Sequence, residues 1–315
     1  VNTASRVGAF GAGLAVAFGA ALGVGHLADP RVPAAPAGAH ADGAGHDGMA
    51  SGDDHADGGH AAMDAAAPAT ELPGGLQVAE NGFRLVLDHS TTAAGRAATV
   101  SFRVLDADAQ PLKAYTTSHD KDLHLIAVRR DQTGFQHVHP TLAADGKWST
   151  TLDLTPGPWR LFADFDPAGE APATTLGTDL LVPGPFVPQA LPLPSTTTTV
   201  DGYTVTLDGS LTPGRDSRLT LSVSRAGRPV TDLQPYLAAY GHLVALRQGD
   251  LAYLHVHPDG EPGDGRTQPG PGIVFHTTAP SAGTYRLHLD FKHGGVVRTA
   301  AFTVVAGKEA TTHGH

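Results

Sequence analysis

The sequence predicts an all-β protein: two tandem Ig-like antiparallel β-sandwich domains, preceded by an N-terminal transmembrane or signal helix and a disordered segment. Three observations lead to this fold class. The pattern H-x12-H-x-H-P occurs twice, and self-similarity of this kind indicates duplicated domains. Short β-rich runs follow one another between turn residues, without an amphipathic pattern of helical length. The 39 glycines and 24 prolines suit a β-protein with many turns.

Composition limits the functions that this chain can have. The 315 residues are enough for two domains of ordinary size. The net charge is −10, from 31 acidic and 21 basic residues without a Lys/Arg cluster, which argues against nucleic acid as a partner. Cysteine is absent, which excludes disulfides, thiol nucleophiles and cysteine-ligated metal centres. A metal site in the folded part must therefore use His and carboxylate side chains, since the only methionines are Met49 and Met63.

Residues 1–33 are expected to direct export. Arg6 precedes a run without charges from Val7 to Gly25, which is long enough to span a bilayer. An uncleaved signal anchor is the preferred interpretation, and a cleaved signal peptide is the alternative. Valine at residue 1 suggests a GTG start codon and hence a whole precursor. We therefore expect an extracytoplasmic protein, anchored to the cell membrane by this helix or secreted after cleavage.

Residues 34–70 consist mainly of Ala, Gly, Asp and His and cannot bury enough apolar surface to fold. Histidine-rich tracts of this kind often bind metal weakly. The alternative interpretation is a flexible spacer between the membrane and the domains. Residues 308–315 are expected to form a second flexible tail. The histidines of these two segments are His40, His46, His55, His60, His313 and His315.

Seven β-rich runs predict the first sandwich in residues 71–184, followed by a Pro/Thr-rich linker in 185–198. The same succession of runs predicts the second sandwich in residues 199–307. Each run is rich in β-branched, aromatic or alternating apolar residues and is bounded by turn residues. In the first domain the runs are 82–88, 98–105, 123–128, 135–139, 148–154, 159–165 and 179–182. In the second they are 203–207, 219–223, the hairpin that begins at residue 242, then 273–276, 284–291 and 296–305.

The first copy of the motif predicts that three histidines meet on one face of a hairpin. Residues i and i+2 of a strand point to the same face, so His137 and His139 share a face. A two-residue turn at Asp131 and Gln132 would set His124 opposite His139. Directly opposed residues have Cβ atoms about 4.5–5.5 Å apart, so the three imidazoles would converge as a metal requires.

The second copy predicts the same arrangement, with a turn at Gly249 and Asp250 that sets His242 opposite His257. Three neutral imidazoles with an open position suit Cu(II) or Zn(II), and the order of intrinsic affinities favours copper. The predicted metal ligands are His124, His137, His139, His242, His255 and His257.

Two aspartates, Asp164 and Asp290, occupy equivalent positions near the end of a late run in the two copies. Each could be a fourth ligand, a partner of a ligating histidine or a turn anchor, and the turn role is the preferred interpretation. Additional histidines differ between the copies, so two identical sites are not expected. These are His119 in the first copy and His276, His288 and His293 in the second.

Other functions have less support in the sequence. Gly249, His255, His257 and Glu261 match the first half of the cupin metal motif, which would imply a dioxygenase or isomerase barrel. No Pro-x-Gly-x2-His element follows in register, so we interpret the match as a coincidence. The main alternative to metal binding is a metal-free Ig-like interaction or adhesion module whose histidines are structural. An enzyme such as a metal-dependent oxidase ranks third, because no hydrolase, phosphate-loop or zinc-protease motif occurs.

The segments from Tyr240 to Pro258 and from Asp290 to Ala301 carry a family resemblance. The sequence resembles uncharacterised bacterial exported proteins with duplicated HxHP domains, which are loosely described as secreted or heavy-metal-binding. It is more distantly similar to cupredoxin-like and copper-resistance sandwiches, without their Cys and Met ligands. The resemblance covers residues 76 to 306 and implies metal homeostasis outside the cytoplasm.

We therefore expect extracytoplasmic binding, buffering or delivery of a divalent metal, with copper first and zinc second. The expected partners are metal ions, a membrane metal transporter and, through the N-terminal helix, the membrane itself. The histidine-rich segment would raise the local concentration of metal near the domains.

Overall fold

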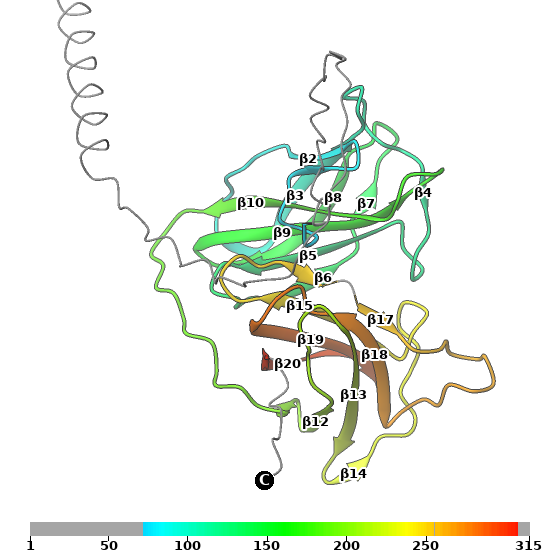
Figure 1. Cartoon of the computed structure of the whole chain (residues 1–315). Coiled ribbons are helices and arrows are strands. Elements are labelled where there is room, and N and C mark those ends of the chain that lie inside the picture. The colour runs from blue at the N-terminus through cyan, green and yellow to red at the C-terminus, as the bar shows by residue number, and fades with distance from the viewer. Residues whose placement is uncertain (1–71, 255, 308–315) are drawn as a thin grey trace, which may run out of the picture. The chain divides into compact units, whose positions relative to one another are not determined.

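Every regular element that the computed structural model describes is a β-strand (Figure 1). The described residues are 72–254 and 256–307, and all of them belong to one compact unit of the chain. Within these two ranges, no helix is long and apolar enough to cross a membrane. The expected N-terminal helix, the histidine-rich segment and the C-terminal tail lie outside the described residues. The prediction of an all-β fold is confirmed.

The first domain contains two antiparallel sheets with the strand orders β1-β2-β3-β8-β7 and β10-β9-β5-β6. The orders β2-β3-β8-β7 and β10-β9-β5 reproduce the two sheets of an immunoglobulin-type sandwich. The strands are β1 (Ala79–Glu80), β2 (Phe83–Leu87), β3 (Gly95–Leu105), β4 (Tyr115–Thr116), β5 (Leu123–Arg129), β6 (Gln136–Val138), β7 (Thr141–Leu142), β8 (Trp148–Leu154), β9 (Gly157–Pro167) and β10 (Thr174–Val182).

The second domain repeats this arrangement with the orders β11-β12-β13-β18-β17 and β16-β15-β19-β20. The duplication expected from the repeated motif is therefore present in the fold. The strands are β11 (Thr197–Val200), β12 (Tyr203–Asp208), β13 (Asp216–Arg225), β14 (Arg228–Pro229), β15 (Gly241–Arg247), β16 (Tyr253–Leu254), β17 (Val256–Pro258), β18 (Gly272–Thr278), β19 (Gly283–His293) and β20 (Val296–Ala306).

Each sandwich has its own core, formed by the alternate residues of its strands that point inward. Trp148 and Trp159 are buried in the first core, and Phe275 and Phe291 in the second. A third apolar cluster joins the β9–β5 sheet of the first domain to the β15–β19 sheet of the second. It consists of Ile126, Val128 and Phe162 from the first domain and Val244, Leu246, Leu251 and Tyr253 from the second, with Phe135 against it.

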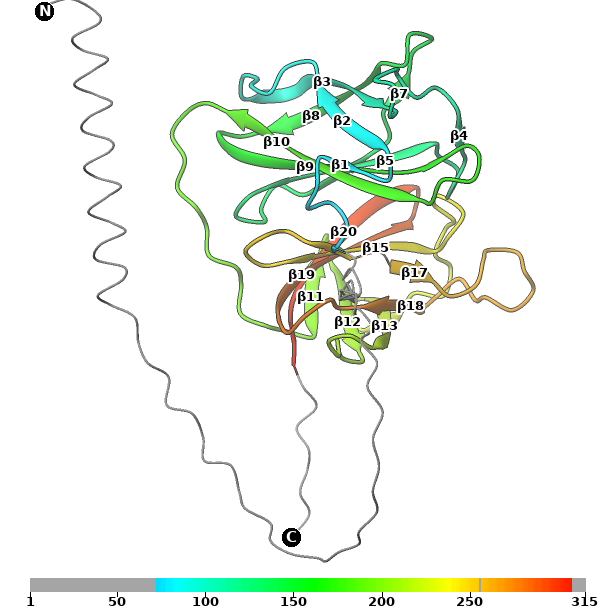
Figure 2. The ribbon, with the colours of Figure 1, turned by 45° about the horizontal axis from the view of Figure 1, so that its top comes forward.

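Strands β5 and β15 are buried along almost their whole length because both of their faces are covered (Figure 2). One face packs into the core of its own domain, and the other faces the neighbouring domain. A strand covered on both faces is expected to be apolar throughout rather than alternating. Such a strand can carry a polar residue only where that residue finds a partner, and each of the two strands carries one histidine.

The predicted register of both histidine hairpins is confirmed. Leu125 pairs with Val138, and Ala245 pairs with Leu254. The turns are longer than the two residues expected, since β5 and β6 are separated by residues 130–135, and β15 and β16 by 248–252.

The prediction that His242 lies opposite His257 is wrong. The chain leaves β16 after Leu254, and His257 pairs instead with His276 of β18 in the other sheet of the domain. In the first domain the chain changes sheets only after His139. There Thr141 and Leu142 form the edge strand β7, which pairs with β8. In the second domain a longer Gly- and Pro-rich connection precedes β18, and residues 256–258 complete the edge.

Candidate metal centre

Three histidines of the first domain gather on the face of the β9–β5–β6 sheet that points away from its own core. His124 is the second residue of β5 and shares its face with Ile126, a residue of the interdomain cluster. His137 lies in β6, and His139 follows that strand. We refer to His124, His137 and His139 as the triad.

The triad has the spacing of ligands to a single ion. One ring nitrogen from each histidine lies within 4.8 Å of the other two. The ring centres are 5.3 Å apart for His124 and His137, and 5.0 Å apart for each of these with His139. An ion about 2.0–2.1 Å from each nitrogen in tetrahedral geometry places neighbouring imidazole centres about 5 Å apart. The first-domain prediction of converging imidazoles is therefore confirmed.

The hydrogen bonds of His124 and His137 leave one nitrogen of each ring facing the other. His124 Nε2–H donates to Ser118 O at 3.1 Å, and His137 Nδ1–H donates to Asp290 Oδ2 at 2.9 Å. The remaining nitrogens, His124 Nδ1 and His137 Nε2, are 3.0 Å apart. Metal-bound histidines commonly donate their outer N–H to a carbonyl or a carboxylate in this way. The lone pairs of these two nitrogens are therefore available to one metal ion.

His139 contributes a buried nitrogen without a hydrogen-bond partner in the described part of the chain. This atom is Nε2. Burying a polar group without a hydrogen bond costs free energy. Its ring stands next to both other members of the triad, so His139 can offer a ring nitrogen to an ion that the other two also bind.

The surroundings keep the imidazoles of His124 and His139 neutral. Burial, followed by the charge of His137, lowers the pKa of His124 to about 4. Burial, followed by the charges of His137 and His124, lowers the pKa of His139 to about 3. A neutral imidazole is the form that coordinates metal, so both rings are ready to bind at neutral pH.

The second domain does not assemble an equivalent group from its described residues. His242 Nε2–H donates to Tyr236 O at 2.9 Å and Leu237 O at 3.0 Å. Its ring centre is 6.2 Å from that of His137, so it lies beside the triad rather than in it. His257 is exposed in β17, and His255 lies outside the described residues.

The comparisons with known proteins identify a family for this duplicated domain. The family model described as "Domain of unknown function (DUF8832)" matches residues 77–179 and again residues 198–308. These matches cover more than half of the chain. The chain belongs to this family. The description assigns no metal, so the expectation drawn from heavy-metal-binding proteins remains a prediction. No curated protein matches the chain.

Among solved structures, this DUF8832 chain is similar to two bacterial adhesins and to the Yersinia protein InvD, each with a low sequence identity and a low TM-score. The adhesin FdeC of Escherichia coli has 18% identity and a TM-score of 0.23 over 73% of this chain and 65% of its own. InvD of Yersinia pseudotuberculosis has 15% identity and a TM-score of 0.24, over 75% and 61%. The Yersinia adhesin InvE has 12% identity and a TM-score of 0.22, over 72% and 60%. The chain thus spans less than two thirds of each of these structures, and scores this low carry no conclusion about its function.

The two aspartates of this DUF8832 chain do not anchor turns, and the preferred interpretation of them was wrong. Each lies within a long strand, where Asp164 pairs with His124 and Asp290 pairs with His242. Thr175 donates its hydroxyl to Asp164, and Thr299 donates in the same way to Asp290. Asp290 lies in the second domain and orients His137 of the first. It is therefore the partner of a candidate ligand.

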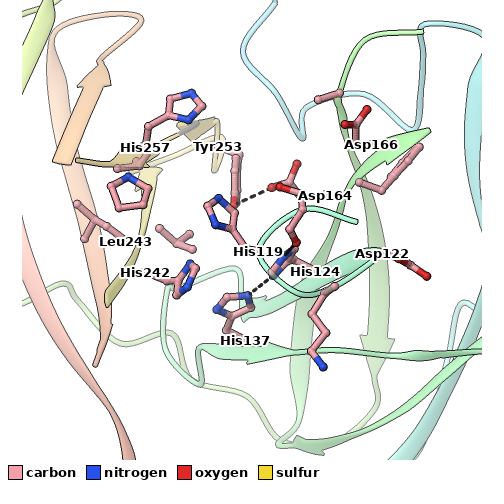
Figure 3. Close-up of a pocket in the computed structure, with 17 residues that line it drawn as sticks. His119, Asp122, His124, His137, Asp164, Asp166, His242, Leu243, Tyr253 and His257 are labelled. Carbon is pink, nitrogen blue, oxygen red and sulfur yellow. Dashed lines mark hydrogen bonds between the residues drawn. The ribbon is translucent and has the colours of Figure 1, made fainter. Parts of the chain in front are cut away.

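A cavity of about 260 Å³ lies next to the triad and is lined by both domains (Figure 3). His124 and His137 form part of its wall. Sequence reasoning missed this cavity and the interface that contains it. The signal was the apolar run from Leu123 to Val128 without alternation, which indicates a strand covered on both faces. The polar lining of the cavity also includes Ser118, His119, Lys121, Asp122, Asp164, Asp166, His242 and His257.

Proposed function

We propose that this protein binds a divalent transition metal through His124, His137 and His139, outside the cytoplasm. The observation that carries the proposal is the meeting of three ring nitrogens within 4.8 Å. His139 Nε2, which is buried without a hydrogen-bond partner in the described part of the chain, supports it. Three imidazoles leave a fourth position open on the ion. The affinity order of divalent ions puts copper before zinc. Binding, buffering or delivery of the metal fits this site, and the N-terminal segment supports export.

Asp290 supports the proposal because it comes from the other domain. Its carboxylate accepts the His137 Nδ1–H at 2.9 Å, and both side chains are only 5% exposed. A carboxylate in this position fixes the imidazole and increases its basicity as a ligand. The site would therefore be completed by the docking of the two domains.

A metal-free interaction module with structural histidines is the second candidate. The observation that favours it is the hydrogen-bonded chain that runs from Asp290 through His137 and His124 to Ser118 O. A proton between His124 Nδ1 and His137 Nε2 would complete this chain without a metal ion. The hydrogen-bonded chain leaves His139 Nε2 without a partner, and that is why metal binding ranks first.

The test is a titration with Cu(II) and Zn(II), followed by calorimetry and electron paramagnetic resonance. It uses a full-length chain, called the background chain, whose other candidate ligands near the termini are removed. We expect saturable binding with nitrogen hyperfine structure in the copper spectrum. The substitutions to Asn are at His26, His40, His46, His55, His60, His313 and His315, with Met49 and Met63 changed to Leu.

The variant that tests the triad is His139→Ala, because it leaves the hydrogen bonds of His124 and His137 with Ser118 and Asp290 in place. We expect a loss of affinity greater than the roughly 10–100-fold that follows loss of an outer partner. The matched control is His89→Ala, at an exposed histidine outside the cavity. Affinity that is the same in His139→Ala and in the background chain would contradict the proposal and favour the metal-free module.

A further inference from the structure

His119 brings a fourth imidazole of the first domain close to His242 of the second. Their ring centres are 5.2 Å apart with the rings nearly perpendicular, which is the separation found within the triad. Two imidazoles on one ion in tetrahedral geometry have centres about 5 Å apart. Both rings line the cavity beside the triad (Figure 3). His119 and His242 thus form a pair with the spacing of two ligands.

The turn that carries His119 has a counterpart in the second domain, and the two turns differ in one respect. Residues 118–121 and 236–239 each form a tight turn closed by two backbone hydrogen bonds. Its two central residues have positive φ, 51° and 62° in the first turn, and 54° and 56° in the second. This conformation favours Gly or Asn over other residues. The central residues are His119 and Asp120 in the first turn, and Leu237 and Ala238 in the second.

The side chain at the first central position differs between the two turns. Leu237 is buried as an ordinary apolar residue, whereas His119 points into the cavity at the domain interface. His124 and His242 each donate Nε2–H to the first residue of their own turn, so the two turns are held alike. The first domain therefore places an imidazole, in a demanding backbone conformation, with its ring centre 5.2 Å from that of His242.

The cavity favours cations. Three carboxylates, Asp122, Asp164 and Asp166, line it against the single ammonium group of Lys121. A cleft with low-dielectric walls and one predominant sign of charge concentrates ions of the opposite sign. The ring centre of His119 is 6.2 Å from that of His124, so an ion at the pair would be adjacent to the triad.

We propose that His119 and His242 form a second, outer position for a divalent cation, on the route from solvent to the triad. This inference rests on the proposed function, because the ion at the outer position would move on to the triad. An ion held by two imidazoles keeps exchangeable water molecules. It passes to the triad by exchange of one imidazole for another, with no change of oxidation state. The outer position binds more weakly than the triad because it offers fewer ligands.

The experiment is a calorimetric titration of the background chain with Zn(II), which is redox-inert. We expect two equivalents, one tight and one weaker. His119→Asn removes the imidazole and keeps a residue that tolerates positive φ, so the turn is preserved. We expect this variant to lose the weaker equivalent and retain the tight one. The matched control is His89→Asn, which changes an exposed histidine outside the cavity and should leave both equivalents unchanged.

His139→Ala makes the outcomes of the two proposals distinct, since it should remove the tight equivalent and leave the weaker one. If the background chain binds one ion, which His139→Ala removes and His119→Asn does not, the outer position is overturned and the proposed function stands. If the one ion is lost in His119→Asn and kept in His139→Ala, the outer position stands and the proposed function fails. Absence of zinc binding to the background chain overturns both.

Discussion

The two domains carry the same histidine motif on the same pair of strands, yet only the first assembles a triad from the described residues. His124 and His242 occupy equivalent positions and hold equivalent turns. The difference arises after the hairpin, where His139 stays beside β5 and His257 joins the opposite sheet. Duplication of a motif therefore does not duplicate a site, because the point at which the chain changes sheets decides which side chains converge.

The interface between the domains extends this comparison, since its contacts come in related pairs. Phe135 stacks on His288 with ring centres 3.9 Å apart, and Tyr253 lies 5.6 Å from Phe162. In the repeat, Phe135 corresponds to Tyr253 and Phe162 to His288. Such reciprocal pairing is the pattern of a two-fold interface between like units. Differences within each pair thus show where one half has acquired a separate role.

The largest effect is expected from breaking the interface itself. Leu246→Ala should lower the free energy of unfolding by about 2–4 kcal/mol, because a fully buried leucine leaves a cavity between the sheets. Denaturant unfolding measures this. Val187→Ala, at a residue that is 82% exposed, should change the free energy by less than about 0.5 kcal/mol. A loss below about 1 kcal/mol for Leu246→Ala would show that the domains do not depend on this contact.

The paired aspartates give the next prediction. Asp290→Asn should weaken binding of Cu(II) to the background chain by roughly 10–100-fold, since the charge that orients His137 is lost. Asp164→Asn is the matched control, because Asp164 has the same threonine contact but accepts a hydrogen bond from Tyr253 and not from a histidine of the triad. Calorimetry compares the two variants. Equal losses of affinity in both would refute the special role of Asp290.

His288 sharpens the comparison through pH. Burial, and next the charge of Arg286, lowers the pKa of His288 to about 3 in the folded protein. In the unfolded chain His288 has its ordinary pKa, so below about pH 6.5 the unfolded chain binds more protons than the folded protein. The free energy of unfolding therefore falls as the pH drops below about 6.5. The loss between pH 7 and 5.5 should be about 1 kcal/mol.

His288→Phe introduces the type of residue that stands at the equivalent position in the first domain, Phe162. This variant should lose about 1 kcal/mol less stability than the parent between pH 7 and 5.5. Urea unfolding at the two pH values measures the difference. Identical pH dependence in variant and parent would show that His288 is protonated in the fold.

The smallest effect is expected in the turns. Ala238→Gly should raise the free energy of unfolding by about 0.5–1 kcal/mol, because alanine at a φ of 56° is strained and exposed. Asp120→Gly should gain less, since aspartate tolerates this conformation better. Thermal unfolding of both variants decides the order. A destabilising Ala238→Gly would contradict the strain argument.

The fold and the first half of the site could be predicted because both depend on local rules. Alternation, turn residues and the repeated motif fix the strands, and the spacing within the motif fixes the hairpin register. The convergence of His124, His137 and His139 follows from that register.

The remainder of the site depends on contacts between residues far apart in the chain. Asp290 meets His137 only because the two sheets pack face to face, and no spacing within one motif encodes this. The early change of sheet at His257 depends on the long connection to β18, whose course the sequence does not reveal. The sequence marks His119 as an extra histidine of the first copy, but its approach to His242 depends on the turn and the interface together.

The chain between Val182 and Thr197 has a consequence for how such a molecule can evolve. In a dimer of identical subunits every substitution appears twice, so a carboxylate gained for one site is imposed on both. A covalent connection between the two halves removes this constraint. One half can keep its histidines together while the other supplies an aspartate and a single imidazole. An asymmetric site such as the proposed metal centre is therefore available to a chain whose two halves are joined, and not to a symmetric dimer.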